Sequence, residues 1–381
     1  MRKWLLPEHV EDILPPEASR IESLRHRVLA VFRSFGYELV IPPMLEFIDS
    51  LLTGTGQDLD LRTFKLVDQI SGRTMGVRAD MTPQVARVDA HLLNRQGVTR
   101  LCYCASVLHT RPRGMTSTRE PLQIGAEIYG HAGVESDIEI QRLLRATLAV
   151  AQLRSPRLDV GHVGVFRALV RRAAVDAELE ADLLEVLRHK DRPGLAALGA
   201  RLDAETAGAL ACLLDLYGGA DVIEAAERLL PDLPDIRAAL AVLRRLSIDS
   251  GEGFGVDLAD LRGYHYHSGV VFAAYAEGLP SALALGGRYD EVGSAFGRAR
   301  PATGFSIDLR ELAMASAVAT PRSAILAPWA DDTALGSKVA ELRRAGEVVI
   351  DDLPGHADTV DELGCDRRLV LRAGQWQVEP I

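Results

Sequence analysis

The sequence has few cysteines, no long apolar run and no excess of basic residues. Its four cysteines are scattered and form no Cys-x-x-Cys pair, so neither a disulfide framework nor a zinc site is predicted. No apolar run approaches the roughly 20 residues that span a bilayer, and the N-terminus lacks a signal-peptide stretch. We therefore expect no membrane segment and a cytoplasmic location. The net charge of -10 disfavours a broad RNA-binding surface, because it repels phosphate backbones.

The remaining composition is that of a globular protein of two or three domains, with 48% hydrophobic and 25% charged residues among 381. Apolar spacing predicts a helix over residues 16–36, ended by Gly36. The period then changes to that of a strand over 37–41, which two prolines close. Further strands are expected at 74–78, 100–108, 122–129, 269–275 and 304–307. This mixture predicts an α+β fold with an antiparallel sheet.

Two stretches differ from this sheet-forming part. Residues 164–248 are rich in Ala and Leu with charges at helical intervals, which predicts a helical insertion. Residues 319–381 predict a small α/β module, with a strand at 323–327, a helix at 334–345 and strands at 348–352, 368–372 and 375–379. The sheet domain is then expected to comprise residues 1–163 and 249–318.

Four separated segments carry recognisable motifs. They are Gly76 to Thr82; Gln123 to Glu127, with the preceding loop 111–119; Leu261 to His267; and Gly286 to Asp290 together with Pro301 to Phe305. In this order and spacing they resemble the catalytic core of histidyl-tRNA synthetase over about residues 5 to 315. The helix, strand and prolines near the N-terminus resemble the dimer-forming motif 1 of class II synthetases. The resemblance implies a class II aminoacyl-tRNA synthetase-like antiparallel sheet flanked by helices, and a homodimer.

The resemblance also implies a histidine-binding pocket. Its matching residues are Asp80, Thr82, Gln123, Glu127, Arg262, Tyr266 and His267. The chemistry fits, because an α-ammonium group needs carboxylate acceptors and an imidazole is read by fixed polar side chains. Gln123 and Glu127 are four residues apart, so on a strand they share one face. The alternative is that Glu127 only solvates an exposed face.

The third segment departs from the family sequence Arg-Gly-Leu-Asp-Tyr-Tyr. This chain keeps Arg262, Gly263 and Tyr266 but has His265 and His267 at the family's Asp and last Tyr. Two histidines could suggest a metal, but the pair lacks the third and fourth ligands of a zinc site, so no metal is predicted. Either histidine can instead be a satisfied side chain near the core, with His267 lining the pocket.

The nucleotide site is degenerate by the same comparison. The motif 2 arginine falls on His109, or with a one-residue gap on Leu108. Arg111 lies two residues beyond His109 and could share its strand face, which would leave some phosphate contact.

In motif 3, Asp308 stands at a glycine and Glu311 at the ATP-binding arginine, while Arg310 should point elsewhere. Each carboxylate beside a triphosphate costs on the order of 1 to 4 kcal/mol. We therefore expect ATP activation to be lost or severely weakened.

The residues after motif 3 are too few for the anticodon-reading domain of the family and include acidic pairs at 331–332 and 351–352 and the acidic Asp358, so no tRNA partner is expected. A retained amino-acid pocket beside a broken ATP site resembles the regulatory subunits of short-form ATP phosphoribosyltransferase, the first enzyme of histidine biosynthesis. Residues 119–127 resemble that family more than a true synthetase. No phosphate-binding loop motif is present that would supply the phosphoribosyl transfer itself.

This second resemblance implies a non-catalytic subunit without a cofactor. It implies a homodimer within a larger hetero-oligomer, with the catalytic subunit as partner and histidine as effector, acting in the pocket or at the subunit interface. The helical insertion is interpreted as a structural cap over the pocket. The alternatives are an authentic histidyl-tRNA synthetase and a stand-alone histidine-binding or RNA-associated relative.

Overall fold

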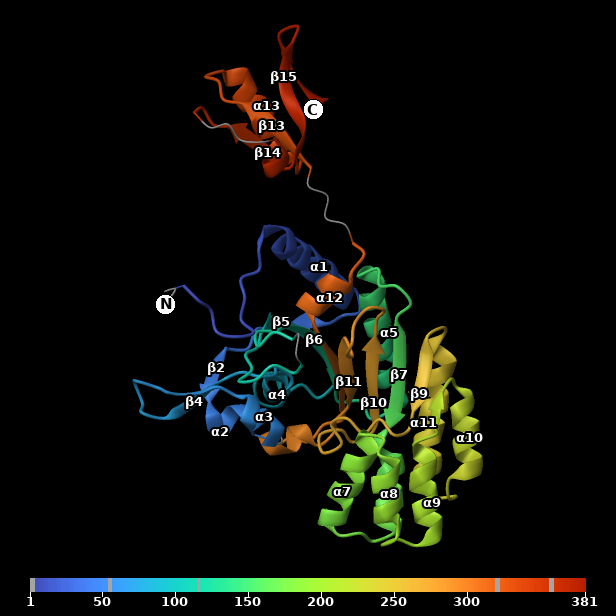
Figure 1. The fold of residues 1–381 in the computed structure, drawn as a ribbon. Coiled ribbons are helices and arrows are strands. Elements are labelled where there is room, and N and C mark those ends of the chain that lie inside the picture. Colours follow the sequence, from blue (N-terminus) through green and yellow to red (C-terminus); the bar gives the residue numbers. More distant parts are fainter. Residues whose placement is uncertain (1–3, 54–56, 115–116, 319–322, 356–359) are drawn as a thin grey trace. The chain divides into compact units, whose positions relative to one another are not determined.

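The fold is that of a computed structural model, which describes residues 4–53, 57–114, 117–318, 323–355 and 360–381 (Figure 1). The chain divides into two compact units, Met1–Val318 and Ala319–Ile381. Across the described ranges, no helix combines the length and the apolar character needed to cross a membrane.

The larger unit is built on a nine-stranded sheet. In spatial order its strands are β1 (Glu38–Leu39), β5 (Thr99–Ser106), β6 (Leu122–Tyr129), β12 (Ala302–Asp308), β11 (Ala284–Arg288), β10 (Val270–Tyr275), β7 (Arg157–His162), β9 (Phe254–Asp257) and β8 (Tyr217–Gly218). The predicted antiparallel sheet is confirmed from β5 to β7. It differs at two pairings, because β1 runs parallel to β5 and β9 runs parallel to β7. Both parallel pairs are joined by long crossovers that return the chain to the same end of the sheet.

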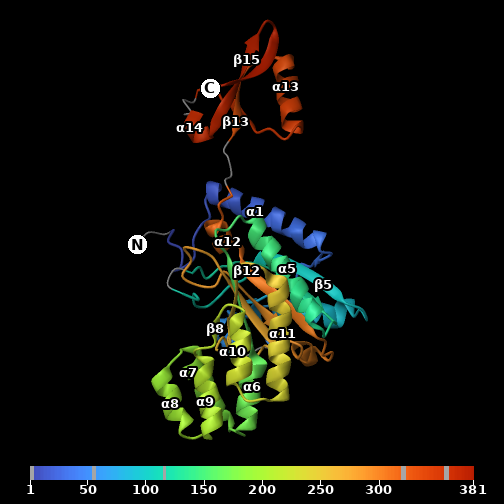
Figure 2. The ribbon, with the colours of Figure 1, turned by 90° about the vertical axis from the view of Figure 1, so that its right-hand side faces the viewer.

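Helices α1 (Pro15–Ser34), α5 (Val134–Val150) and α12 (Leu309–Ala315) cover the sheet. Figure 2 shows α1 and α5 packed side by side. The buried residues of α1 recur at helical spacing, and they are Ile21, Leu24, Val28 and Phe32. Gly36 follows the helix with a φ of 85°, a conformation that glycine adopts without strain. The helix and stop signal predicted at 16–36 are therefore confirmed.

A second, three-stranded sheet leads into the candidate site. Its strands, in the order β2, β4 and β3, are Leu45–Phe47, Thr74–Val77 and Lys65–Val67. Short helices α2 (Ile48–Leu51) and α3 (Gln57–Arg62) precede β3 and β4 in the chain. After β4 the chain turns into α4 (Thr82–Arg87) and a π-helical turn, η1 (Val88–Leu93). The loop between β4 and α4 thereby brings residues 78–82 to the main sheet.

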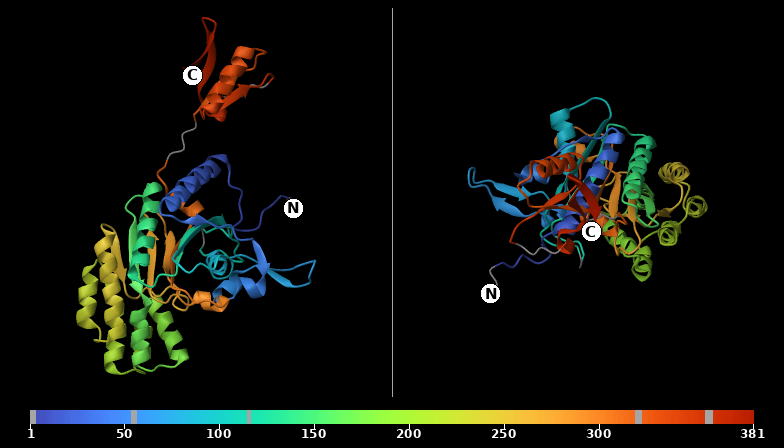
Figure 3. Two further views of the ribbon diagram at one scale, coloured as in Figure 1. Left: turned by 180° about the vertical axis from the view of Figure 1, so that it is seen from behind. Right: turned by 90° about the horizontal axis from the view of Figure 1, so that it is seen from above.

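The Ala- and Leu-rich stretch is helical, as predicted (Figure 3). Its helices are α6 (Val163–Arg172), α7 (Ala177–Arg188), α8 (Arg192–Gly199), α9 (Ala204–Leu213), α10 (Asp221–Leu229) and α11 (Pro234–Ser250). Asp176, Asp191 and Asp203 accept backbone N–H bonds at the starts of α7, α8 and α9, which satisfies donors that have no partner within the helix. These helices belong to the same compact unit as the sheet, so a separate inserted domain stays a prediction.

The smaller unit has the α/β order expected from the sequence. Its elements are β13 (Ala324–Pro328), α13 (Thr333–Arg344), β14 (Val349–Asp352), α14 (Val360–Leu363), β15 (Cys365–Arg372) and β16 (Gln375–Pro380). The sheet order is β14-β13-β15-β16, with only β16 antiparallel to its neighbour. β15 begins at Cys365, earlier than predicted. The acidic position Asp358 lies outside the described residues.

Candidate functional site

Glu127 lies at the centre of β6, between β5 and β12, and is 1% exposed. Its carboxylate accepts hydrogen bonds from three hydroxyl groups: Thr82 at 3.1 Å, Tyr103 at 3.0 Å and Tyr289. These donors come from α4, from β5 and from the residue that follows β11, so three separate segments converge on one side chain. The alternative of an exposed Glu127 on a solvated face is therefore wrong.

Two glycines make room for this cluster. A Cβ at Gly304, directly opposite Glu127 on β12, would come within 1.5 Å of the carboxylate oxygen Oε2. A Cβ at Gly125 would come within 2.5 Å of the Tyr103 hydroxyl. Any side chain at either position would therefore displace the buried carboxylate or its donor.

A second polar pair lies beside the first. The Gln123 amide donates to Asp80 at 3.1 Å and accepts the backbone N–H of Met81 at 2.9 Å. Asp80 in turn accepts the backbone N–H of Thr82 at 2.9 Å. Gln123 and Glu127 therefore reach the same stretch, residues 80–82, as expected of two residues on one strand face.

Burial controls the charge of this site. Removal from water raises the pKa of Glu127 to about 8, and the nearby charge of Asp80 adds to the rise, while the three hydroxyl hydrogen bonds oppose it. Near pH 7 the carboxyl group is therefore mostly protonated. An incoming cation would favour the ionised form, so the site is prepared to exchange a proton for a positively charged group.

Four tyrosines surround the carboxyl group: Tyr103, Tyr129, Tyr266 and Tyr289. The rings of Tyr266 and Tyr289 lie 5.1 Å apart. The hydroxyl of Tyr266 is buried and has no hydrogen-bond partner among the residues that the structure describes, whereas the Tyr129 hydroxyl interacts with Tyr289. A buried polar group without a partner is costly, so the Tyr266 hydroxyl is available to a polar ligand.

Sequence reasoning named Tyr266 but missed the other three tyrosines. Tyr289 stands inside the motif Gly286 to Asp290, so it could have been found there. Tyr103 and Tyr129 look like ordinary strand residues in the sequence.

The structure does not bring all the predicted pocket residues together. The Arg262 guanidinium is committed to Asp260, at 2.7 Å, and to the Tyr275 hydroxyl, at 2.9 Å, rather than to Glu127 or Asp80. It therefore holds its own segment in place.

His267 is packed rather than free. Its ring contacts Gly263 and Gly287, where an added Cβ would come within 2.8 Å of it. Its Nδ1–H donates to the Arg288 carbonyl at 3.2 Å. Burial lowers the pKa of His267 to about 4, so the ring is neutral, as a satisfied side chain near the core would be. His265 is exposed and contacts the ring of Tyr264.

The positions that match the motif 2 arginine offer no cation. His109 is fully buried, and its Nε2–H donates to the Ala79 carbonyl at 2.9 Å. Burial lowers the pKa of His109 to about 4. β5 ends at Ser106, so the shared strand face predicted for His109 and Arg111 is wrong: the chain has left the sheet, and Arg111 is exposed. Residues 115 and 116 of the same loop lie outside the described residues.

At motif 3 the two acids have different roles. Asp308 is the N-cap of α12, accepting the backbone N–H groups of Arg310 at 3.0 Å and Leu122 at 3.2 Å. Burial raises the pKa of Asp308 to about 6. Glu311 is half-buried, which raises the pKa of its carboxyl group, and the charge of Arg113 opposes this rise. Arg310 is buried; it pairs with Glu11 of the N-terminal segment at 2.7 Å and donates to the Thr118 hydroxyl at 3.4 Å. That it points away from a nucleotide stays a prediction.

The sheet, the converging motifs and the buried acid at the centre of β6 define a class II aminoacyl-tRNA synthetase-like protein. Residues 9–312 match the family model for histidyl-tRNA synthetase, and residues 322–379 match that for the ATP phosphoribosyltransferase subunit HisZ C-terminal domain. The chain belongs to the family of ATP phosphoribosyltransferase regulatory subunits. The fold class and the family resemblance expected from the sequence are thereby confirmed.

Individual relatives support this assignment. The chain is 59% identical over 380 residues to an ATP phosphoribosyltransferase regulatory subunit of Azoarcus sp. strain BH72, covering 100% of this chain and 99% of the relative. It is 60% identical over 381 residues to one of Burkholderia cenocepacia, covering 100% of both.

Solved structures agree with the fold. An ATP phosphoribosyltransferase regulatory subunit/histidyl-tRNA synthetase from Bacillus halodurans C has a TM-score of 0.84 at 29% identity, covering 95% of this chain and 96% of that one. Histidyl-tRNA synthetase from Nostoc sp. PCC 7120 has a TM-score of 0.79 at 17% identity, covering 100% and 97%, which is a likeness of fold alone.

Proposed function

We propose that this chain is the non-catalytic subunit that activates a short-form ATP phosphoribosyltransferase catalytic subunit and carries histidine feedback. The observation that supports this most is the buried Glu127 cluster beside nucleotide positions that have lost their cations. The residues that match the amino-acid part of a synthetase site converge on Glu127, and the positions that match its ATP part carry His109, Asp308 and Glu311 in place of arginines and a glycine. Such a site can bind an amino acid without activating it.

The pocket chemistry suits histidine. Glu127 and Asp80 offer carboxylates to an α-ammonium group, and their pairing with Thr82 and Gln123 fixes their orientation. The Tyr266 hydroxyl has no partner in the described structure and can pair with an imidazole nitrogen. The family pattern also named Arg262 and His267 as pocket residues. We propose that these two side chains hold in place the segment that carries Tyr266.

Feedback requires that histidine bind two arrangements of the assembly unequally. The effector site is then either this pocket or a subunit interface. We propose that histidine acts in this pocket, because the polar groups of the pocket converge on the buried acid Glu127.

Mixing with a short-form catalytic subunit tests the function. We expect the two chains to co-elute, phosphoribosyl transfer to ATP to rise on mixing, and histidine to suppress that rise. The catalytic subunit with an unrelated protein is the control. Separate elution with unchanged transfer would contradict the proposal and favour a stand-alone histidine binder.

Synthetase activity is expected to be absent. The purified chain should show no histidine-dependent ATP–pyrophosphate exchange, because charge that builds on the α-phosphate finds no arginine at His109 or Glu311. Glu311→Arg should tighten ATP binding by about tenfold, because it removes a carboxylate that repels the phosphates and adds a guanidinium that attracts them. It should not produce ATP–pyrophosphate exchange. The matched control is Glu291→Arg at an exposed acid. Appreciable exchange by the unmodified chain would identify it as an authentic synthetase.

A homodimer within a larger hetero-oligomer, in the cytoplasm, is part of the proposal. β1 is an edge strand of the main sheet, and exposed apolar side chains lie on it and just after it: Leu39, Ile41, Met44 and Leu45. Such a row is the kind of edge that a second chain covers. Sedimentation of the isolated chain as a monomer would contradict the dimer.

A further inference from the structure

The helical insertion contacts the segment that carries Tyr266. One nitrogen of the Arg167 guanidinium, Nη2, donates from α6 to the backbone carbonyl of Tyr264 at 2.7 Å and to that of His267 at 2.8 Å. These two carbonyls lie on either side of Tyr266 in the chain. Hydrogen bonds from a charged donor are stronger than neutral ones, so Arg167 ties the backbone around Tyr266 to α6.

Tyr264 adds a side-chain contact with the insertion. Its ring lies edge-on to Phe166 of α6, with the ring centroids 5.2 Å apart, and the Arg167 guanidinium lies 4.8 Å from the centroid of the Tyr264 ring. The Tyr264 hydroxyl donates to Glu180 of α7 at 2.6 Å, and the residue is 5% exposed. Tyr264 stands where the synthetase sequence Arg-Gly-Leu-Asp-Tyr-Tyr has a leucine, which has no hydroxyl to donate. The hydrogen bond to Glu180 is therefore not part of that motif.

The same segment forms a wall of the candidate pocket. The ring of Tyr266 lies 5.1 Å from that of Tyr289, which donates to Glu127. The turn that joins Tyr264 to Tyr266 is short and hydrogen-bonded, because the N–H groups of Tyr266 and His267 both donate to the carbonyl of residue 263 at 2.8 Å. A displacement of Tyr264 is therefore passed on to Tyr266.

We propose that Arg167 and Glu180 are positioning residues for histidine binding. By holding Tyr264 between them, they keep the Tyr266 hydroxyl turned toward the imidazole of the ligand. This rests on the proposed function, which makes the pocket the histidine site. Such coupling is reciprocal: if the contact between Tyr264 and Glu180 strengthens binding, bound histidine stabilises that contact by the same factor. The insertion then takes part in feedback as well as serving as a cap.

The test is calorimetric titration of the whole chain with histidine. Tyr264→Phe, which keeps the ring, and Glu180→Ala are each expected to weaken binding about three- to tenfold, the cost of one hydrogen bond. Arg167→Ala frees two carbonyls and should weaken binding by about tenfold or more. Glu180→Gln keeps an acceptor oxygen and should restore most of the affinity. Circular dichroism and Tm confirm that each variant is folded.

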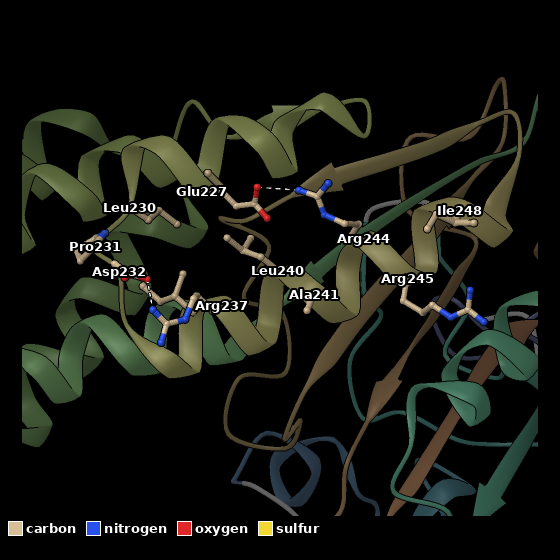
Figure 4. Close-up of a pocket in the computed structure, with 12 residues that line it drawn as sticks. Glu227, Leu230, Pro231, Asp232, Arg237, Leu240, Ala241, Arg244, Arg245 and Ile248 are labelled. Atoms are coloured by element: carbon tan, nitrogen blue, oxygen red, sulfur yellow. Dashed lines mark hydrogen bonds and ion pairs between the residues drawn. The ribbon is translucent and has the colours of Figure 1, made fainter.

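Two controls change the insertion without touching this contact. Glu178→Ala removes an exposed acid from the same first turn of α7. Arg244→Ala breaks an ion pair with Glu227, at 2.7 Å, beside a groove of about 570 Å³ between α10 and α11 (Figure 4). All the residues that line this groove fall within 226–248, outside α6, α7 and the segment 261–267. Both variants should bind histidine as the unmodified chain does.

A double-mutant cycle separates positioning from a general loosening of the fold. In a Tyr266→Phe background, Glu180→Ala should cause little further loss of affinity, because the hydroxyl through which Glu180 acts is already absent. Amide hydrogen exchange gives a second readout. Histidine should slow exchange in α7 of the unmodified chain but not in that of Tyr264→Phe.

The outcomes separate the inference from the proposed function. If the unmodified chain binds histidine and Glu180→Ala binds it equally well, the inference is overturned and the proposed function stands. Losses that simply add in the cycle, or equal losses in Glu178→Ala and Arg244→Ala, also overturn the inference. If the unmodified chain binds no histidine, the proposed role of the pocket fails as well.

Discussion

Glu127→Gln is expected to weaken histidine binding by about a hundredfold and to relieve histidine inhibition while the complex with the catalytic subunit still forms. The substitution keeps the size of the side chain but removes the charge that an α-ammonium group would neutralise in a buried site. A lost charge-to-charge hydrogen bond in such a site costs on the order of 3 kcal/mol, because one partner stays buried and unpaired. Calorimetric titration with histidine measures the effect, and Glu291→Gln at an exposed acid is the control.

The affinity for histidine should also depend on pH, and Glu127→Gln should change that dependence. Burial raises the pKa of Glu127 to about 8, whereas a bound ammonium group would lower it. Binding therefore releases a proton, and the affinity of the unmodified chain should rise between pH 6.5 and pH 8, by up to roughly tenfold per pH unit. Glu127→Gln has no proton to release at this position, so its affinity should vary much less over that range.

Stability gives an independent check that the variant is folded. The folded pKa of Glu127, about 8, lies above its ordinary value of 4.5. Its contribution to the free energy of unfolding is thus fully present below about pH 4.5 and is lost as pH rises towards 8. A neutral glutamine avoids this loss, so the Tm of Glu127→Gln relative to the unmodified chain should be higher at pH 8 than at pH 5. Unchanged histidine inhibition in a folded variant would place the effector site at a subunit interface.

Arg288→Ala is expected to destabilise the larger unit by about 3–5 kcal/mol, because it leaves a buried charge unpaired. Arg288 pairs with Asp137 at 2.8 Å, with side-chain exposures of 9% and 2%. It also donates to the Ser136 hydroxyl and to the carbonyls of His131 and Gly133. Removing it leaves Asp137 buried without its cation, while the two carbonyls keep their hydrogen bonds from Ser136.

The measurement is the free energy of unfolding by urea, with Arg171→Ala as the control. Arg171 forms a comparable pair with Asp235 at 2.7 Å, but both side chains are mostly exposed. That loss should cost less than about 1 kcal/mol. Similar costs for the two variants would contradict the role given to Arg288. Because Arg288 directly precedes Tyr289, the variant should also loosen the tyrosine that donates to Glu127.

The sequence predicted the elements that depend on local pattern. β6 has the predicted bounds, 122–129, because its alternation is clear and its ends are marked by a proline and a glycine. α1 followed from apolar spacing and from Gly36. The Glu127 position followed from the family motif, as did its association with Thr82.

The sequence did not show where long side chains would find their partners. Arg262 was expected in the pocket and instead pairs with Asp260, while Asp308 was read as a charge facing ATP and is also the cap of α12. The prediction that His109 and Arg111 share a strand face was wrong, because β5 ends at Ser106, three residues before His109. Each of these three outcomes depends on where a strand or helix ends and the chain turns away. The spacing of motifs in the sequence does not give that position.

By itself, the sequence determined the order of helices and strands, the class of the fold and the loss of arginine from the nucleotide positions, since these follow from local periodicity and residue identity. Only the tertiary structure decided that Glu127 is buried with three hydroxyl donors, because Thr82, Tyr103 and Tyr289 come from segments up to 162 residues away from it in the chain. Burial and hydrogen bonding depend on which distant segments pack together, and the pKa of the acid follows from that packing rather than from its neighbours in sequence.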